Sequence, residues 1–261
     1  MEFMFFKYQA TGNDFIIIDN REKNISLSIT QIEHLCHRRF GIGADGLILF
    51  QLKDGFDFEM KYFNADGKES TMCGNGGRCI VQFALQQIGM KKDKYYFLAA
   101  DGPHEATLEE NGWVHLKMKD VEHVEKYYAD AIVNTGSPHY VKLVEDVQEM
   151  NVKKEGRAIR NSSRFKKEGI NVDFVQEDTD AIYVRTYERG VEDETLSCGT
   201  GVTAAALVMA HNERGFNRID VTTPGGKLAV EFEKTGDETF TNIWLCGPAE
   251  YVFKGFINIE D

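Results

Sequence analysis

The sequence lacks the features that are typical of low-complexity, membrane-spanning and secreted proteins. Its 261 residues include only four prolines and two tryptophans, and no low-complexity tract interrupts them. Nowhere do apolar residues run together for the roughly 18 positions that a membrane-crossing helix needs. The first residues are too quickly charged for a signal peptide. We therefore expect a globular cytoplasmic protein with no membrane partner.

Positive charge is also scarce. Thirty lysines and arginines stand against 42 acidic residues, which gives a formal net charge of −12. Nucleic-acid binding needs a basic surface to neutralise phosphates, and the sequence shows no basic stripe. We expect no nucleic-acid partner. The acidic balance leaves the substrate open, because steering depends on the local field near a site.

The five cysteines are too few and too scattered for a disulfide-stapled fold, and no Cys-x-x-Cys pair is present. A zinc ribbon and a thioredoxin-like redox motif are therefore disfavoured, and thiols are expected. His34, Cys36 and His37 cluster, but a buried cysteine on a helix beside exposed histidines explains them better than a metal site. We predict no bound metal.

The two halves of the chain share three short patterns in the same order. The offsets follow from 135 − 11 = 124, 198 − 73 = 125 and 226 − 102 = 124. Three matches at nearly one offset indicate a duplication. The matched pairs are Thr11-Gly12 with Thr135-Gly136, Cys73-Gly-Asn-Gly76 with Cys198-Gly-Thr-Gly201, and the segments around Gly102 and Gly226.

The duplication predicts two pseudo-symmetric domains of an α+β fold, each a curved mixed β-sheet or barrel around a central helix. The first would span 1–119, with a strand at about 250–261 returning to it, and the second 120–249. Apolar, helix-forming residues follow each repeated cysteine and predict the central helices. The predicted helices are 30–39, capped by Ser28 or Thr30, 78–88 and 202–210. The segments predicted to form the strands of the first half are 5–20, 47–50, 56–63, 95–99 and 105–117, with turn residues at Gly12-Asn-Asp14, Asp66-Gly67 and Asp101-Gly-Pro103.

Each repeated cysteine precedes a glycine-rich helix start, which suits proton transfer at an amino-acid α-carbon. Inverting that carbon needs a base on one face and an acid on the other, and Cys73 and Cys198 would supply them. A helix N-terminus lowers a thiol pKa from about 8.5 toward neutrality. Its free N–H groups bind an anion such as the substrate carboxylate and stabilise the charge that develops there.

Other interpretations of these cysteines remain. A phosphatase loop is excluded, because Cys73 and Arg78 are spaced Cys-x4-Arg and the second copy has no arginine. Cys79 is expected in the core, since six residues along a helix do not place it on the face of Cys73. A non-catalytic binding domain and a thiol-redox protein stay open from the residues alone.

The motifs around both cysteines resemble those of the diaminopimelate epimerase family over the whole chain. The Asn75-Gly-Gly-Arg78 continuation and the pair Glu188-Arg189 separate this resemblance from the related proline racemases. The motifs are Ala10-Thr-Gly-Asn-Asp-Phe15, Gly41-Ile-Gly-Ala-Asp45, Phe63-Asn-Ala-Asp-Gly67, Met72-Cys-Gly-Asn-Gly-Gly-Arg78, Gly136-Ser-Pro-His139, Gly169-Ile-Asn-Val172, Tyr187-Glu-Arg-Gly190 and Ser197-Cys-Gly-Thr-Gly201.

The resemblance implies a homodimeric epimerase without a cofactor that converts LL-diaminopimelate to the meso form, for lysine and peptidoglycan synthesis. It implies that Cys73 and Cys198 are acid and base, and that His139 and Glu188 tune their pKa values. The substrate would be held by Asn13, Asn64, Gly74, Asn75, Asn171, Glu188, Arg189, Gly199 and Thr200.

Two positions depart from the family pattern. Gly46 stands where many members carry glutamine, and Ser137 where many carry asparagine before Pro-His. Ser137 can still form a hydrogen bond through its hydroxyl, whereas Gly46 has no side chain to offer. Within the same enzyme class, a proline or hydroxyproline racemase is the alternative, for which Asn171 and Arg189 would have no distal carboxylate to bind.

Overall fold

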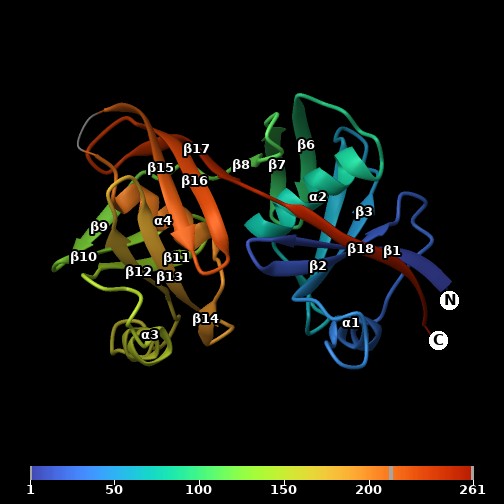
Figure 1. The fold of residues 1–261 in the computed structure, drawn as a ribbon, viewed down its shortest axis with the longest axis horizontal. Coiled ribbons are helices and arrows are strands. Elements are labelled where there is room, and N and C mark those ends of the chain that lie inside the picture. The colour runs from blue at the N-terminus through green and yellow to red at the C-terminus, as the bar shows by residue number, and fades with distance from the viewer. Residues whose placement is uncertain (1, 212–213, 260–261) are drawn as a thin grey trace. The chain divides into compact units, whose positions relative to one another are not determined.

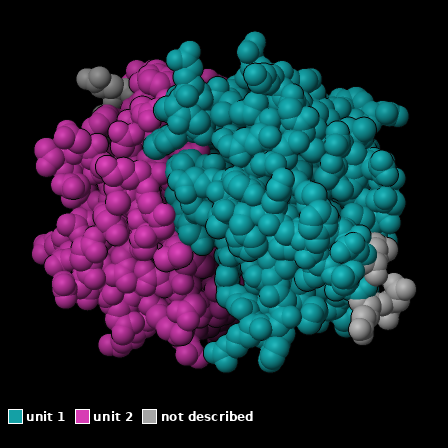
Figure 2. All heavy atoms as spheres, turned by 45° about the vertical axis from the view of Figure 1, so that its right-hand side comes forward, with its two compact units in different colours: residues 1–116, 248–261 teal, residues 117–247 magenta. Residues whose placement is uncertain are grey.

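The computed structural model describes residues 2–211 and 214–259, and the chain divides into two compact units. Unit 1 comprises residues 1–116 and 248–261, and unit 2 comprises residues 117–247 (Figure 2). The last two residues of the predicted C-terminal strand lie outside the described residues. No helix in the described ranges is long and apolar enough to cross a membrane.

Unit 1 is a mixed β-sheet with one central and one peripheral helix (Figure 1). Its strands pair in the order β18-β1-β2-β3-β4-β6-β7-β8, with the short β5 also on β4. The pairs β2/β3 and β4/β6 are parallel, and the others are antiparallel. The elements are β1 (Glu2–Ala10), β2 (Asn13–Asp19), α1 (Ile29–Cys36), β3 (Gly46–Gln51), β4 (Phe58–Asn64), β5 (Glu69–Ser70), α2 (Gly74–Gln86), β6 (Lys94–Ala99), β7 (Gly102–Leu108), β8 (Val114–Lys117) and β18 (Glu250–Asn258).

Unit 2 repeats this succession. Its strands pair in the order β9-β10-β11-β12-β13-β15-β16-β17, with β14 on β13, and the parallel pairs are β11/β12 and β13/β15. The predicted fold class, two repeated mixed-sheet domains, is confirmed. The elements are β9 (Val124–Tyr127), β10 (Asp130–Asn134), β11 (Pro138–Leu143), α3 (Val152–Arg160), β12 (Asn171–Glu177), β13 (Ile182–Glu188), β14 (Asp193–Thr195), α4 (Gly199–Val208), β15 (Gly215–Thr223), β16 (Gly226–Lys234) and β17 (Phe240–Gly247).

The central helices α2 and α4 are buried almost all round. Helix α2 contacts β1 to β4 and β18, and α4 contacts β10 to β13 and β15 to β17. Its run of alanine, valine and leucine carries no polar face, which is the pattern of a helix inside a core. Both helices begin directly after their cysteine, earlier than the predicted starts at Arg78 and Val202, because packing overrides the poor helix propensity of glycine.

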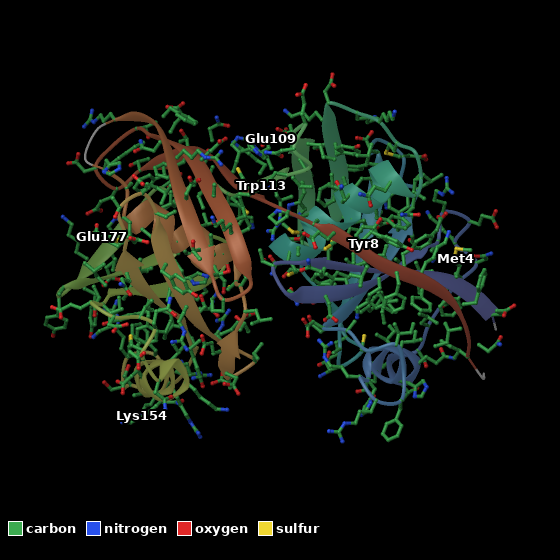
Figure 3. The ribbon with its side chains drawn as sticks, viewed as in Figure 1. Met4, Tyr8, Glu109, Trp113, Lys154 and Glu177 are labelled. Carbon is green, nitrogen blue, oxygen red and sulfur yellow. The ribbon has the colours of Figure 1, made fainter. Side chains whose placement is uncertain are left out.

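Turns divide two of the segments predicted to form strands; the first of these turns was expected near Gly12, and the second was not. The segment 5–20 is the hairpin of β1 and β2, whose turn residues Thr11 and Gly12 have φ values of 47° and 83°. The segment 105–117 is divided between β7 and β8 by a turn in which Trp113 accepts a hydrogen bond from the Glu109 amide, at 2.9 Å (Figure 3). Gly112, with φ of 86°, allows this reversal.

Helix α1 begins as predicted and ends early. Ser28 caps it in a capping box with Gln31, so Ser28 and not Thr30 is the N-cap. The helix stops at Cys36, three residues before the predicted end, because His37 is already extended. The chain then turns back, and the amides of Ile42 and Gly43 donate to the Leu35 carbonyl at 2.9 and 3.0 Å.

Candidate active site

One edge of each sheet gathers the predicted site residues of that unit. In unit 2, β11 and β12 run parallel, with His139 opposite Asn171, and β13 returns antiparallel so that Glu188 lies next to Asn171. In unit 1, β2 and β3 begin at the corresponding edge, and Asn64 at the end of β4 pairs with Gly46. The parallel pair thus places side chains distant in sequence side by side in both units.

Cys73 is the N-cap residue of α2, and its side chain is half-buried. Its thiol donates to the side-chain oxygen of Asn13 at 3.6 Å, and the Asn75 amide donates to the same oxygen at 3.2 Å. The first amides of an α-helix have no partner inside the helix. A thiol, two carboxamides and these amides therefore form the part of the predicted site that lies in unit 1, called here its half-site. Such a group of donors suits an anionic group of a substrate.

A network of charged side chains fixes the orientation of the Asn13 side chain. Its amide donates to Asp45 at 2.6 Å, Arg38 bridges Asp45 and Asp14 at 2.7 Å each, and Lys7 contacts Asp14 at 2.7 Å. Burial alone would raise the pKa of Asp14, but hydrogen bonds from Arg38 and Lys7 hold it well below its usual range. Asn13 is thus locked with its oxygen toward Cys73.

Arg78 supports the same half-site from inside the protein. Its side chain is fully buried, and it donates to Asn75 at 2.9 Å and to Thr11 at 3.3 Å. The carbonyls of Gly74 and Pro248 accept from it at 3.5 and 3.4 Å. Neither Arg78 nor Asp45 was assigned a role from sequence, although an arginine in the first turns of a buried helix is a signal that could have found Arg78.

Asn64 and Gly46 pair with each other where β4 ends and β3 begins. Asn64 is exposed in the turn after β4, where its backbone bonds Gly67 and Lys68 at 2.9 and 3.0 Å. A Cβ at Gly46 would lie 2.5 Å from the Tyr62 ring and 2.6 Å from the Phe63 carbonyl oxygen, so this backbone has no room for a side chain.

Cys198 is the N-cap residue of α4, only 9% exposed, with its sulfur 3.5 Å from the Thr200 hydroxyl. Burial raises the pKa of this thiol well above its ordinary value, and the charges of Glu188 and Asp173 raise it further. Hydrogen bonds with Thr200 and Gly201 act in the opposite direction and lower this pKa. The expectation that the helix N-terminus brings this pKa toward neutrality is therefore wrong for Cys198, because desolvation outweighs the helix end.

His139 is fully buried between Asp173 and Thr200. Its Nδ1 lies 2.7 Å from Asp173 and its Nε2 2.9 Å from the Thr200 hydroxyl. Thr186 donates to the other oxygen of Asp173 at 2.7 Å. Both ring nitrogens are thus occupied, so His139 is held as a hydrogen-bonding group and not as a metal ligand.

Asn171, Ser137 and Arg189 form a polar cluster beside His139. The Asn171 amide donates to the Ser137 hydroxyl at 2.8 Å, and the Arg189 backbone amide donates to the Asn171 oxygen at 2.8 Å. The Arg189 guanidinium reaches the same hydroxyl at 3.4 Å. Ser137 therefore takes part in the cluster through its hydroxyl, and the exposed guanidinium suits a carboxylate.

The predicted residues thus fall into two groups, one in each unit. Unit 1 holds Asn13, Asn64, Cys73, Gly74 and Asn75, and unit 2 holds His139, Asn171, Glu188, Arg189, Cys198, Gly199 and Thr200. Asp173 was not found from sequence. A carboxylate that follows Asn171 by two residues inside an apolar strand was the available signal.

Comparison with known proteins gives a consistent family. Residues 5–124 and 131–252 match the diaminopimelate epimerase family. The chain is 49% identical to the diaminopimelate epimerase of Flavobacterium psychrophilum, covering 95% of this chain and 98% of that one. It is 41% identical to the diaminopimelate epimerase of Chlorobaculum tepidum, covering 96% and 99%.

Solved structures share the fold at low sequence identity. A phenazine biosynthesis protein of the PhzF family from Bacillus anthracis superposes with a TM-score of 0.78 at 15% identity, covering 99% of this chain and 100% of that one. A hydroxyproline epimerase from Agrobacterium vitis gives 0.69 at 13% identity, covering 100% and 93%. With the sequence relatives, these findings show that the chain is an isomerase and belongs to the diaminopimelate epimerase family.

Proposed function

We propose that this epimerase interconverts LL- and meso-diaminopimelate with Cys73 and Cys198 as the two proton-transfer groups. The observation that carries the proposal is that each cysteine is the N-cap of the central helix of its unit, followed by glycine. The names of the full-length relatives support the substrate. The product would serve lysine and peptidoglycan precursor synthesis in the cytoplasm.

In the proposed reaction, one cysteine removes the α-proton as a thiolate and the other returns a proton from its thiol to the opposite face. The raised pKa of Cys198 keeps it protonated at neutral pH, which is the form that donates. Amides at the helix starts would bind the α-carboxylate and stabilise negative charge during proton loss. No electron-withdrawing cofactor takes part in this proposal.

The cluster of Asn171, Ser137 and Arg189 favours a substrate with a second polar end. Its guanidinium and amide groups complement a carboxylate, and a diaminopimelate molecule carries one at each end. A proline-type substrate would leave this cluster without that partner. We therefore expect Arg189→Ala to raise the KM for diaminopimelate by about tenfold or more, the effect of losing one charged hydrogen bond.

Deuterium exchange tests the two-thiol proposal. The protein, kept reduced, is incubated with LL-diaminopimelate in D2O, and the α-proton signal is followed by NMR. We expect wild-type protein to incorporate deuterium while forming the meso isomer, and Cys73→Ala and Cys198→Ala to abolish epimerisation. Unchanged turnover in both variants would overturn the proposal. Turnover of proline that persists in Arg189→Ala would favour the racemase alternative.

We also propose a homodimer, as the family resemblance implies. Light scattering coupled to size exclusion measures the mass directly, with 29.6 kDa expected for one chain and twice this value for a dimer. A single-chain mass at micromolar concentration with full activity would contradict the dimer.

A further inference from the structure

Unit 2 contains a buried carboxylate that the two-thiol reaction does not use. Asp173 and His139 are both 0% exposed and lie 2.7 Å apart. The second carboxylate oxygen accepts the Thr186 hydroxyl at 2.7 Å. Burying a charge costs free energy unless it is paired and hydrogen-bonded, and both oxygens of Asp173 are satisfied in this way. The Asp173 carboxylate is therefore placed to fix the orientation of the His139 ring.

The contacts of Asp173 define which nitrogen of His139 carries the proton. An ionised carboxylate only accepts hydrogen bonds, so Nδ1 must donate to it. The other nitrogen, Nε2, faces two donors: the Thr200 hydroxyl at 2.9 Å and the Asn171 amide at 3.5 Å. Nε2 is thus an acceptor, and its lone pair points toward Thr200.

Thr200 connects this histidine to the reactive sulfur. Its hydroxyl oxygen lies 2.9 Å from Nε2 of His139 and 3.5 Å from the sulfur of Cys198. Its backbone oxygen accepts the Thr135 hydroxyl at 2.8 Å, which restrains the residue. A continuous line of hydrogen bonds therefore runs from Cys198 through Thr200 and His139 to Asp173.

We propose that Asp173 is a positioning residue for a proton relay that takes the proton of Cys198 through the Thr200 hydroxyl to Nε2 of His139. The S–H bond breaks and its electron pair stays on sulfur as the thiolate. The sulfur proton bonds to the Thr200 oxygen, while the original hydroxyl proton bonds to Nε2. The resulting imidazolium is stabilised by the Asp173 carboxylate, and no proton is gained or lost overall. The purpose of the relay rests on the proposed role of Cys198.

Gly201 shows how close the carboxylate lies to the helix that carries Cys198. A Cβ at this position would collide with the Asp173 carboxylate and approach the Thr186 hydroxyl within 3.2 Å. Because residue 201 is glycine, the first turn of α4 can pack directly against the Asp173 carboxylate. A negative charge at a helix N-terminus is itself favourable.

The relay and a simple charge effect predict opposite results for the loss of Asp173. The titratable groups that act on the Cys198 thiol are Glu188 and Asp173, and both negative charges raise its pKa. Removing one of them through space alone would make the thiol more acidic. If Asp173 works through His139, its removal makes the imidazolium less stable and the thiolate harder to form.

Alkylation of Cys198 distinguishes the relay from the through-space charge effect. Full-length protein without substrate is treated with iodoacetamide across a pH series, and modification of the Cys198 peptide is measured by mass spectrometry. We expect Asp173→Asn to shift the alkylation profile to higher pH and to slow the reaction at pH 8 about tenfold, the effect of losing a charged hydrogen bond. Alkylation that is unchanged or faster would overturn the relay.

Matched variants separate the relay from altered access to the sulfur. Glu188→Gln removes the other negative charge and should shift the profile to lower pH, which shows that the assay detects a through-space effect. Thr200→Val should slow alkylation as Asp173→Asn does, whereas Thr200→Ser keeps the hydroxyl and should restore the wild-type profile. Equal profiles for the valine and serine variants would contradict the relay.

The wild-type protein provides a test that needs no stable Asp173 variant. ¹⁵N shifts of the His139 ring, assigned with His139→Gln, report which nitrogen is protonated. We expect the proton on Nδ1, and a neutral ring protonated on Nε2 would overturn the inference. Neither measurement involves diaminopimelate, so the relay and the proposed reaction can fail separately.

Discussion

At the scale of single residues, the Asp14 carboxylate links the charged side chains that hold Asn13 beside Cys73. It accepts from Arg38 at 2.7 Å and contacts the buried Lys7 at 2.7 Å, while Arg38 continues to Asp45 and thereby to Asn13. Losing the carboxylate would leave the ammonium of Lys7 buried without its ion-pair partner, which is far more costly than losing an exposed pair.

Asp14→Asn should lower the free energy of unfolding by about 3 kcal/mol at pH 7. The pKa of Asp14 is lowered in the folded state, so its stabilisation is complete above the unfolded value of about 3.9. It is lost as pH falls through the lower folded value. Urea unfolding at pH 7 and at acid pH measures the difference, which should shrink on acidification.

The exposed pair of Asp19 and Arg21 provides the control. Its side chains are 32% and 42% exposed, and Asp19→Asn should cost less than about 1 kcal/mol at either pH. A cost for Asp14→Asn as small as this would show that the network does not depend on its central carboxylate.

Arg78→Lys should damage the half-site of unit 1 although it keeps the charge. The guanidinium reaches Asn75, Thr11 and two backbone carbonyls at once, and an ammonium cannot occupy this geometry. We expect a loss of about 2 kcal/mol of stability and about a tenfold lower kcat/KM for epimerisation. Thermal unfolding and steady-state kinetics measure the two effects. Arg21→Lys, on the surface, should change neither.

From the residues alone, functional residues could be predicted where a pattern repeats, and the other site residues came from the family resemblance. Cys73 and Cys198 were identified because the same cysteine and glycine spacing occurs in both halves. Asp45 and Asp173 carried no such pattern. Asp45 meets Asn13 across 32 positions and Asp173 meets His139 across 34, and contacts at this separation come from sheet pairing that composition and periodicity do not encode.

At the scale of elements, the two helix starts tolerate a methyl group to different degrees. A Cβ at Gly76 would approach the flexible end of Met60 at 3.1 Å, whereas one at Gly201 would collide with a carboxylate fixed by two hydrogen bonds. The equivalent glycines of the repeat therefore have different neighbours. One neighbour can move, and the other cannot.

Gly201→Ala should cost about 2–3 kcal/mol of stability and abolish epimerisation, because the helix start or Asp173 must shift. Gly76→Ala, its match in unit 1, should cost about 1 kcal/mol or less, since Met60 can change rotamer and alanine favours the helix. Chemical denaturation and activity assays compare the two variants. Equal costs would contradict the assignment of the difference to Asp173.

Elements followed from sequence where local signals agree with the tertiary structure. A cap at Ser28 or Thr30 predicted the start of α1, and the apolar run after Cys198 predicted the buried α4. The starts of α2 and α4 were placed too late because glycine disfavours an isolated helix. The turn between β7 and β8 was missed because Asn111-Gly112 lies within a run that otherwise suits a strand.

At the scale of the whole molecule, unit 1 is discontinuous and unit 2 is not. Strand β18 pairs with β1 from Glu2 opposite Asn258 to Gln9 opposite Glu250, so residues far apart in the chain complete one sheet. The duplication predicted this two-unit plan from sequence. A strand at about 250–261 was predicted to return to the first domain, whereas the other strand pairings, on which the detailed boundaries depend, are not readable from local sequence.

Truncation after Gly247 should therefore damage one unit selectively. Removing β18 exposes the backbone edge of β1, and we expect amide protection to fall by at least about tenfold in β1 and β2 while β12 and β13 keep theirs. Hydrogen exchange with mass spectrometry measures both regions in one sample. Equal loss of protection in β12 and β13 would show that the two units do not unfold separately.

The pairing of β1 with β18 also has a consequence for the order of events during synthesis. The ribosome makes β1 and its neighbour β2 first, but the other neighbour of β1, strand β18, emerges only after all of unit 2 has been translated. Unit 2, with Cys198, has its full set of strands while unit 1, with Cys73, still has an open edge. A nascent or prematurely terminated chain therefore holds at most one complete sheet, and the sheet of unit 1 is completed only when residues 250–258 leave the ribosome.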